Sequence, residues 1–244
     1  MSELSGRTTI VVGASRGIGH GIATAVAEAG APVVAVSRTA AEFPESADIT
    51  QELADAGEAA VPASLIDRHE PAAVIVVAGA TPHMRPLQQH TWETFSAAWD
   101  TDVRITFHWL REALLTPLPP GSRVIVVSSG AALNGSPLSG GYAGAKATQR
   151  FVTGYAQGES KRAGLDITFT TVLPRFAPET GVGKPAVAAY AALAGMSVAE
   201  FLSHQGPLLT PKIAGESMVD LLRTDASDVA DAYGLSGAGL KKLA

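Results

Sequence analysis

A tyrosine and a lysine stand four residues apart in the segment Tyr142-Ala143-Gly144-Ala145-Lys146. The segment opens a predicted helix, and residues four apart lie on one face of a helix, so the two side chains can act together. A tyrosine with its ordinary pKa of about 10 is a poor base at neutral pH, and a neighbouring ammonium favours the phenolate. The pair therefore suits general acid or base catalysis, although the same spacing also arises by chance.

A serine stands thirteen residues before Tyr142, at the end of the predicted strand in Val126-Val127-Ser128-Ser129-Gly130. The hydroxyl of Ser129 can hydrogen-bond a reacting oxygen. Ser129, Tyr142 and Lys146 together predict a site that moves a proton to or from an oxygen atom.

A glycine-rich turn near the amino end reads Gly-x-x-x-Gly-x-Gly and is followed by a predicted helix from His20 to Glu28. Glycines allow a tight turn and close backbone approach, and the free N–H groups of the next helix can hold a pyrophosphate. A plain loop also uses glycines, but a strand before and a helix after favour a dinucleotide site. The predicted contact residues are Gly13, Ser15, Arg16, Gly17, Ile18 and Gly19.

The second predicted strand ends in Ser37-Arg38. An enzyme that prefers NAD usually places an acidic residue here for the ribose 2′-hydroxyl, and an acid would repel a 2′-phosphate. Arg38, Ser37 and Arg16 can instead donate charge-assisted hydrogen bonds to that phosphate, which indicates NADP(H). The alternative is two surface arginines without a ligand.

Five short apolar runs predict strands buried on both faces, with helical segments between most of them. These runs are Thr8 to Val12, Pro32 to Val36, Ala72 to Ala78, Arg123 to Ser128 and Ile167 to Leu173. Alternation of strand and helix predicts an α/β fold, a single-domain Rossmann-type doubly wound parallel sheet with helices on both faces. We expect residues 1–244 to form one catalytic domain, in which the irregular segment 175–211 covers the substrate.

The stretch from Thr91 to Leu115 places Phe95, Trp99, Val103 and Phe107 at four-residue steps. Such a stripe on one helix needs a cover, which is either the sheet or another subunit.

Composition excludes several other classes of protein. The net charge is −5 with no basic stripe, which argues against a nucleic-acid partner. No leader or bilayer-length apolar run is visible, so we expect a cytoplasmic protein with no membrane partner. The chain has no cysteine and its six histidines lack ligand spacing, so we expect no metal site.

The glycine turn, Ser129 and Tyr-x-x-x-Lys, in this order, resemble the classical branch of the short-chain dehydrogenase/reductase family over Thr8 to Pro174. The resemblance implies that Tyr142 is the general acid or base and that Ser129 positions the carbonyl. It also implies that Lys146 binds the nicotinamide ribose and lowers the pKa of the tyrosine.

Further cofactor contacts are implied by the same resemblance, at Asp48 and Ile49 for the adenine and at Ala78, Gly79 and Pro174. The family's fourth catalytic position, an asparagine, aligns with Asp102, with Trp99 or Asp100 as alternatives. The charge of Asp102 would favour the Lys146 ammonium and oppose ionisation of Tyr142.

The chain departs from the family pattern at four places. Val76-Val77 replaces two asparagines, and Arg175 stands where a glycine is usual. The interval from Arg38 to Asp48 is too short for the usual helix and third strand, so we expect a shortened adenine side. The closing segment, from Asp231 to Ala244, lacks the usual Asp-Gly-Gly, which puts the usual subunit contacts there in doubt.

The leading interpretation is an NADPH-dependent carbonyl reductase or alcohol dehydrogenase acting on a small molecule. The alternatives are a 3-oxoacyl reductase on a carrier-bound chain and a non-catalytic NADP-binding sensor. Family resemblance favours a homotetramer or homodimer. The apolar residues of Lys184 to Pro207 suit a pocket or plain packing equally, and Arg175 is a candidate contact for an anionic substrate group.

Overall fold

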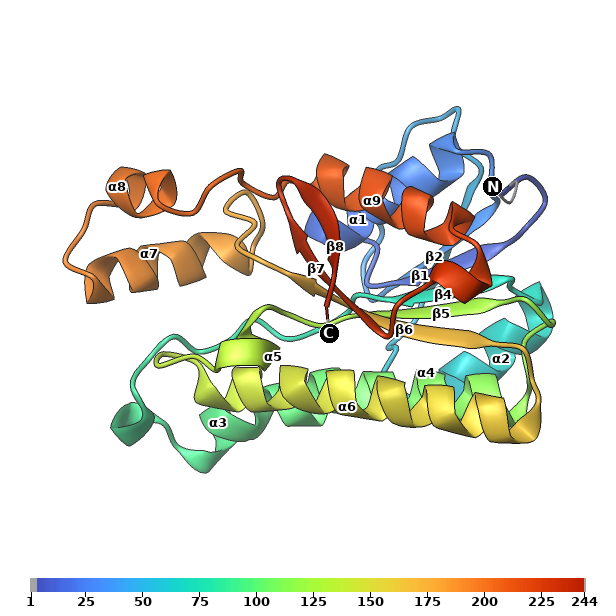
Figure 1. Cartoon of the computed structure of the whole chain (residues 1–244), viewed down its shortest axis with the longest axis horizontal. Coiled ribbons are helices and arrows are strands. Elements are labelled where there is room, and N and C mark those ends of the chain that lie inside the picture. The colour runs from blue at the N-terminus through green and yellow to red at the C-terminus, as the bar shows by residue number, and fades with distance from the viewer. Residues whose placement is uncertain (1–3, 244) are drawn as a thin grey trace.

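Eight strands form one sheet in the order β3-β2-β1-β4-β5-β6-β7-β8 (Figure 1). The computed structural model describes residues 4–243, so the two ends of the predicted domain, 1–3 and 244, lie outside the described residues. The first seven strands of this order pair in parallel, and β8 pairs antiparallel with β7. The strands are β1 Thr9–Val12, β2 Val33–Ser37, β3 Ile49–Leu53, β4 Ala73–Val76, β5 Arg123–Val127, β6 Thr168–Pro174, β7 Ala232–Ser236 and β8 Gly239–Lys242.

Helices cover both faces of the sheet, as the alternation of strand and helix predicts. Figure 1 shows α1 and α9 on one face and α2, α4 and α6 on the other. The helices are α1 Gly17–Glu28, α2 Ala60–His69, α3 Trp92–Ala98, α4 Arg104–Leu115, α5 Ala131–Asn134, α6 Gly140–Ala163, α7 Gly183–Leu193, α8 Val198–Ser203 and α9 Pro211–Arg223. Short 3₁₀ turns are η1 Leu87–Gln89 and η3 Ala226–Asp228, and a π-helical turn, η2, spans Trp99–Val103. Within residues 4–243, no helix is long and apolar enough to cross a bilayer.

The apolar strands separate two cores because successive side chains point to opposite faces. Val11 and Ile75 face the core under α1 and α9. Ile10 and Val74 face the other core, where Trp109 of α4 is fully buried. The prediction of strands buried on both faces is therefore confirmed.

The interval between β2 and β3 corrects one expectation. Residues 39–48 contain no helix, as predicted from their number, but a third strand does form at Ile49–Leu53 and pairs with β2. This strand, Ile-Thr-Gln-Glu-Leu, lies at the sheet edge and is mostly exposed or half-buried. An edge strand needs no continuous apolar run, so that criterion does not find it.

The predicted helix from Thr91 to Leu115 is divided by the π-helical turn η2. After this turn, α4 buries Ile105, Trp109 and Ala113 in the core against the sheet instead of the predicted stripe. Trp99 and Phe107 of that stripe stay 41% and 53% exposed. The sheet is thus not the cover of the stripe.

Two segments extend past the carboxyl ends of the strands. The chain between β6 and α9 forms α7 and α8, which project away from the body of the molecule (Figure 1). At the end of the chain, β7 and β8 form a hairpin with a two-residue loop at 237–238. The closing segment therefore continues the sheet up to Lys242.

Candidate active site

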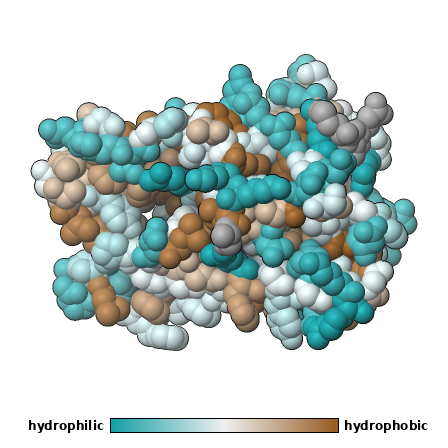
Figure 2. Space-filling model, viewed as in Figure 1, coloured by the Kyte–Doolittle hydropathy of each residue, from teal (hydrophilic) through white to brown (hydrophobic). Residues whose placement is uncertain are grey.

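A cavity of about 1040 Å³ lies at the carboxyl edge of the sheet. Loops after β1, β2, β4, β5 and β6 line it, which is where ligands of open α/β sheets bind. Figure 2 shows the surface hollowed between the α7–α8 projection and the body below it. The predicted residues that line the cavity are Gly13, Ser15, Arg16, Gly17, Ile18, Gly19, Ser37, Arg38, Ala78, Gly79, Asp102, Ser129, Tyr142, Lys146 and Pro174.

The glycine turn connects β1 to α1 and leaves no room for side chains at two of its positions. A Cβ on Gly13 would lie 2.6 Å from the Ala78 nitrogen, and one on Gly19 would lie 2.1 Å from the Gly13 oxygen. Gly13 and Gly17 also have φ values of 93° and 57°, which disfavour other residues. The helix start has no side-chain cap, so its N–H groups stay available to an anion. The backbone around this turn therefore fits a dinucleotide pyrophosphate.

Two cations line the same cavity, Arg16 from the turn between β1 and α1 and Arg38 from the loop after β2. Arg16 and Arg38 are exposed and line it, and neither makes an ion pair within residues 4–243. The Ser37 hydroxyl donates to the Thr39 carbonyl at 2.7 Å. The two arginines are thus better placed than Ser37 to receive a phosphate.

The predicted adenine contacts at Asp48 and Ile49 are wrong in position. Asp48 precedes β3, and its carbonyl accepts from the Val33 N–H at the amino end of β2. Neither residue lines the cavity, because parallel strands bring only their carboxyl ends to that edge. Asp55, just after β3, does line it, and its Oδ1 accepts from the Gly57 N–H at 2.9 Å.

The predicted catalytic residues come from the end of β5 and the start of α6. Tyr142 is half-buried, and the Lys146 Nζ lies 5.4 Å from the centre of its ring. The hydroxyl of Ser128 donates to the Lys146 carbonyl at 2.7 Å, which ties α6 to the end of β5. Its neighbour Ser129 lines the cavity and accepts from the Ala131 N–H at 3.2 Å. The structure therefore brings Ser129, Tyr142 and Lys146 to one cavity.

Asp102 is fully buried and contacts two parts of the site. Its Oδ2 lies 2.9 Å from the Lys146 Nζ, and its Oδ1 accepts from the Ala80 N–H at 2.7 Å. The two alternatives for this position do not fit. Trp99 is 41% exposed, and Asp100 is exposed and accepts from the Ser96 hydroxyl.

Two opposing effects determine the pKa of Lys146. Burial lowers the pKa of Lys146, whereas the charges of Asp102 and Tyr142 and the hydrogen bond to Asp102 raise it. The pKa of Lys146 stands above its ordinary value, so the side chain is a cation at neutral pH.

The π-helical turn η2 gives Asp102 a second function in packing. Its backbone carbonyl accepts from the Gln149 Nε2 at 3.2 Å, and the same nitrogen donates to the Thr106 hydroxyl at 2.6 Å. Single π-helical turns within a longer helix occur often at functional sites. Gln149 carries no sequence signal that separates it from other helical glutamines, so only the fold identifies this contact.

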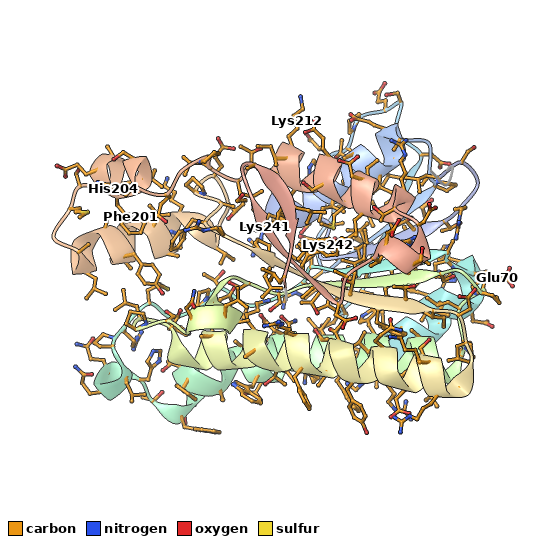
Figure 3. The ribbon with its side chains drawn as sticks, in the orientation of Figure 1. Glu70, Phe201, His204, Lys212, Lys241 and Lys242 are labelled. Atoms are coloured by element: carbon orange, nitrogen blue, oxygen red, sulfur yellow. The ribbon has the colours of Figure 1, made fainter. Side chains whose placement is uncertain are left out.

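An aromatic cluster forms the wall of the cavity under α7 and α8. The Phe176 ring lies 5.5 Å from the Tyr190 ring and 5.6 Å from the Phe201 ring, measured between centroids. All three line the cavity with Ala186, and Figure 3 shows Phe201 on α8. The predicted apolar set of this segment is therefore divided between cavity, core and surface. Val187 is buried, while Leu193 and Met196 are 58% and 42% exposed.

Several other lining residues were not predicted. Besides Asp55, these include Arg104 at the start of α4, Thr180 before α7, and Lys241 and Leu243 at the end of the chain. Asp55 follows β3, but that strand has no apolar run to mark it in the sequence. The others reach the cavity through the arrangement of distant elements, for which a single sequence offers no signal.

A sequence profile described as short chain dehydrogenase matches residues 7–191, which is most of the chain. This chain belongs to the short-chain dehydrogenase family. Enzymes of the family are oxidoreductases that use nicotinamide cofactors. One curated relative, a hydroxynaphthalene reductase-like protein of Metarhizium majus, is 30% identical over 70% of this chain and 68% of its own.

Solved structures share the fold. A short chain dehydrogenase from Burkholderia cenocepacia in complex with NADP has a TM-score of 0.75 at 21% identity, covering 96% of this chain and 89% of its own. A 3-ketoacyl-(acyl-carrier-protein) reductase from Brucella melitensis complexed with NADH has a TM-score of 0.75 at 23% identity, covering 96% and 98%. These two structures contain different cofactors, so the choice of cofactor rests on this chain's own residues.

Proposed function

We propose that this short-chain dehydrogenase is an NADPH-dependent carbonyl reductase of small molecules, which also runs in reverse as an alcohol dehydrogenase. The observation that carries the proposal is that Ser129, Tyr142 and Lys146 line the cavity that also contains the glycine turn. A non-catalytic sensor would need no proton donor at this place.

Four residues of the chain have distinct roles in the proton transfer. Tyr142 donates its phenolic proton to the substrate oxygen as that oxygen gains negative charge. The Ser129 hydroxyl donates a hydrogen bond to the same oxygen, and the Lys146 ammonium stabilises the phenolate that remains. Asp102 holds that ammonium in place. NADPH, when bound, would supply a hydride for the carbonyl carbon, and this hydride with the proton from Tyr142 would give an alcohol.

The preference for NADPH rests on Arg38 after β2 and Arg16 in the turn between β1 and α1. Arg38 and Arg16 have no partner acids in residues 4–243, and the loop after β2 has no acid at the position usual for NAD. Gly13, Ser15 and Gly17 to Gly19 would hold the pyrophosphate, with Ala78, Gly79 and Pro174 along the rest of the cofactor. Segment 175–211 would cover the substrate within a single catalytic domain.

We also propose that the enzyme is a homo-oligomer that assembles through α4 and α6. Phe107 of α4 and Phe151 and Tyr155 of α6 are 53%, 74% and 61% exposed, and α4 packs against α6. Exposed aromatic residues gathered on neighbouring helices are typical of a protein interface.

The first test is titration of the full chain with NADPH and NADH, followed by turnover of a panel of ketones and aldehydes. We expect tighter binding of NADPH, and turnover that Tyr142→Phe lowers by at least about 10²-fold, since general acid catalysis contributes about 10²–10⁴-fold. Binding of NADPH should survive in Tyr142→Phe. Tight binding with no turnover of any compound would instead favour the sensor.

A further inference from the structure

Two cations line the part of the cavity that lies toward the β8 edge of the sheet, away from the proposed 2′-phosphate site after β2. Arg175 directly follows β6, and Lys241 lies in β8. In the order of strands, β6, β7 and β8 are separated from β2 and β3 by β1, β4 and β5. These two cations are therefore placed for the substrate end of the cavity rather than for the adenosine end.

The hairpin at the end of the chain directs Lys241 to this position. Lys241 pairs with Gly234 of β7, and Gly234 pairs with Leu173 of β6. Directly paired residues point to the same face of a sheet, and Gly234 has no side chain to separate Lys241 from β6. Figure 3 shows Lys241 on the hairpin, between the α7–α8 projection and the centre of the molecule.

Arg175 approaches the same place from the other side of β7. Its N–H donates to the Leu235 carbonyl at 2.8 Å, so it continues the pairing of β6 with β7. The backbones of β6 and β8 lie two strand spacings apart, roughly 10 Å. Arginine and lysine side chains are long enough to converge on one small group across that gap.

No acidic side chain neutralises this pair in the described part of the chain. The only acids that line the cavity there are Asp55, after β3, and Asp102, which is paired with Lys146. Neither Arg175 nor Lys241 makes an ion pair in residues 4–243, and both are exposed to the cavity. Two positive charges without a counter-charge attract an anion.

We propose that Arg175 and Lys241 bind a carboxylate of the substrate, so that the enzyme acts on keto acids whose acid group lies apart from the reacting carbonyl. The guanidinium of Arg175 matches a carboxylate with two parallel hydrogen bonds, and Lys241 adds a point charge. This inference rests on the proposed reductase function. It specifies the substrate class, which the aromatic cluster of Phe176, Tyr190 and Phe201 does not determine by itself.

The test compares ketones that differ only in this charge, namely 4-acetylbenzoate and levulinate against their methyl esters. The variants are Arg175→Met and Lys241→Met, with Lys242→Met as the matched control. Lys242 is the next residue of β8, is exposed and does not line the cavity.

We expect the wild type to prefer the acids. Each cavity variant should lower the acid-to-ester ratio of kcat/KM about tenfold, mainly through KM, because uniform binding of the carboxylate is lost. Lys242→Met should keep the wild-type ratio. Raising the ionic strength should lower the ratio for the wild type, since the two cations are exposed.

An acid-to-ester ratio that neither variant changes would overturn this inference and leave the reductase function intact. If no ketone is turned over, the proposed function fails, and binding decides the inference separately. In that case the thermal midpoint of the NADPH-bound chain should rise with 4-acetylbenzoate and not with its ester, and Lys241→Met should remove the rise. Equal midpoints for acid and ester would overturn it.

Discussion

At the residue scale, the site depends on a buried ion pair. Lys146 and Asp102 have side chains 5% and 0% exposed, and their charged atoms lie 2.9 Å apart. Taking two charges out of water is costly, and removing one partner leaves the other unpaired in the interior. The pair therefore constrains the site more than it stabilises the fold.

Asp102→Asn tests this pair through stability. Asparagine keeps an acceptor for the Ala80 N–H, but Lys146 loses its carboxylate, and breaking such a pair costs about 3–5 kcal/mol. In the wild type the pKa of Lys146 is raised, so its stabilising effect persists at every pH below the unfolded pKa of about 10.4. In the variant burial prevails and lowers this pKa, so stability should fall as the pH drops from 9 to 6.

Urea unfolding of both proteins at pH 6 and pH 9 measures this effect. An equal loss in the free energy of unfolding at the two pH values would contradict it.

The pH dependence of activity offers a second measurement of the same substitution, Asp102→Asn. While Lys146 keeps its proton, removal of the carboxylate leaves a net positive charge beside Tyr142. The activity-limiting ionisation should then move to lower pH.

Arg38→Ala tests the choice of cofactor. Loss of a charge-assisted hydrogen bond costs about 1.5–3 kcal/mol, so the ratio of the Kd for NADPH to that for NADH should rise about 10- to 150-fold. Fluorescence titration gives both constants. Arg68→Ala removes another exposed arginine, which pairs with Glu52 and does not line the cavity, and it should leave the ratio unchanged. An equal loss of affinity for both cofactors would argue against a 2′-phosphate contact.

At the scale of elements, the position of α6 depends on where it meets α3 and η2. A Cβ on Gly141 would lie 2.0 Å from the Phe95 carbonyl oxygen, whereas one on Gly144 would lie 3.6 Å from the Trp99 ring. The helix that carries Tyr142 and Lys146 therefore touches the backbone of α3 at Gly141. This contact holds the face of α6 that carries Tyr142 and Lys146 toward the cavity.

Gly141→Ala and Gly144→Ala form a matched pair on one helix. The first forces backbone apart and should destabilise the protein by about 1–3 kcal/mol or more. The second meets only ordinary van der Waals contacts, so the higher helix propensity of alanine should make it neutral or stabilising by up to about 1 kcal/mol. Urea denaturation measures both, and similar losses for the two variants would show that α6 is not held by this close approach.

At the scale of the whole molecule, the exposed aromatic residues of α4 and α6 are the observation that bears on assembly. We expect Phe151→Glu to convert the oligomer to a monomer, because a charge placed within an apolar interface is desolvated without a partner. Light scattering after size-exclusion chromatography measures the mass. Leu193→Glu, at a residue of α7 that is 58% exposed, is the control and should keep the native mass. A monomeric wild type would refute the proposed interface.

The sequence by itself determined the features that depend on local spacing. The period of a helix places Tyr142 beside Lys146. Within the tight turn, the positive φ of Gly13 and the close approach of Gly19 to the Gly13 carbonyl oxygen require glycine at both positions. The alternation of buried strands and helices leads to the sheet, and the end of each strand indicates where the cavity lies. These features need no knowledge of distant contacts.

Tertiary structure decided what depends on packing between distant segments. Asp48 and Asp55 flank one exposed edge strand, and only the pairing of β3 with β2 shows that Asp55 is at the cavity edge. The contact of Asp102 with Lys146 requires the π-helical turn η2, because an uninterrupted helix would rotate that side chain elsewhere. Lys241 reaches the cavity because the final hairpin adds β8 to the sheet. In each case the energy of burying a face or pairing an edge selects the arrangement, and that energy belongs to contacts between segments far apart in the chain.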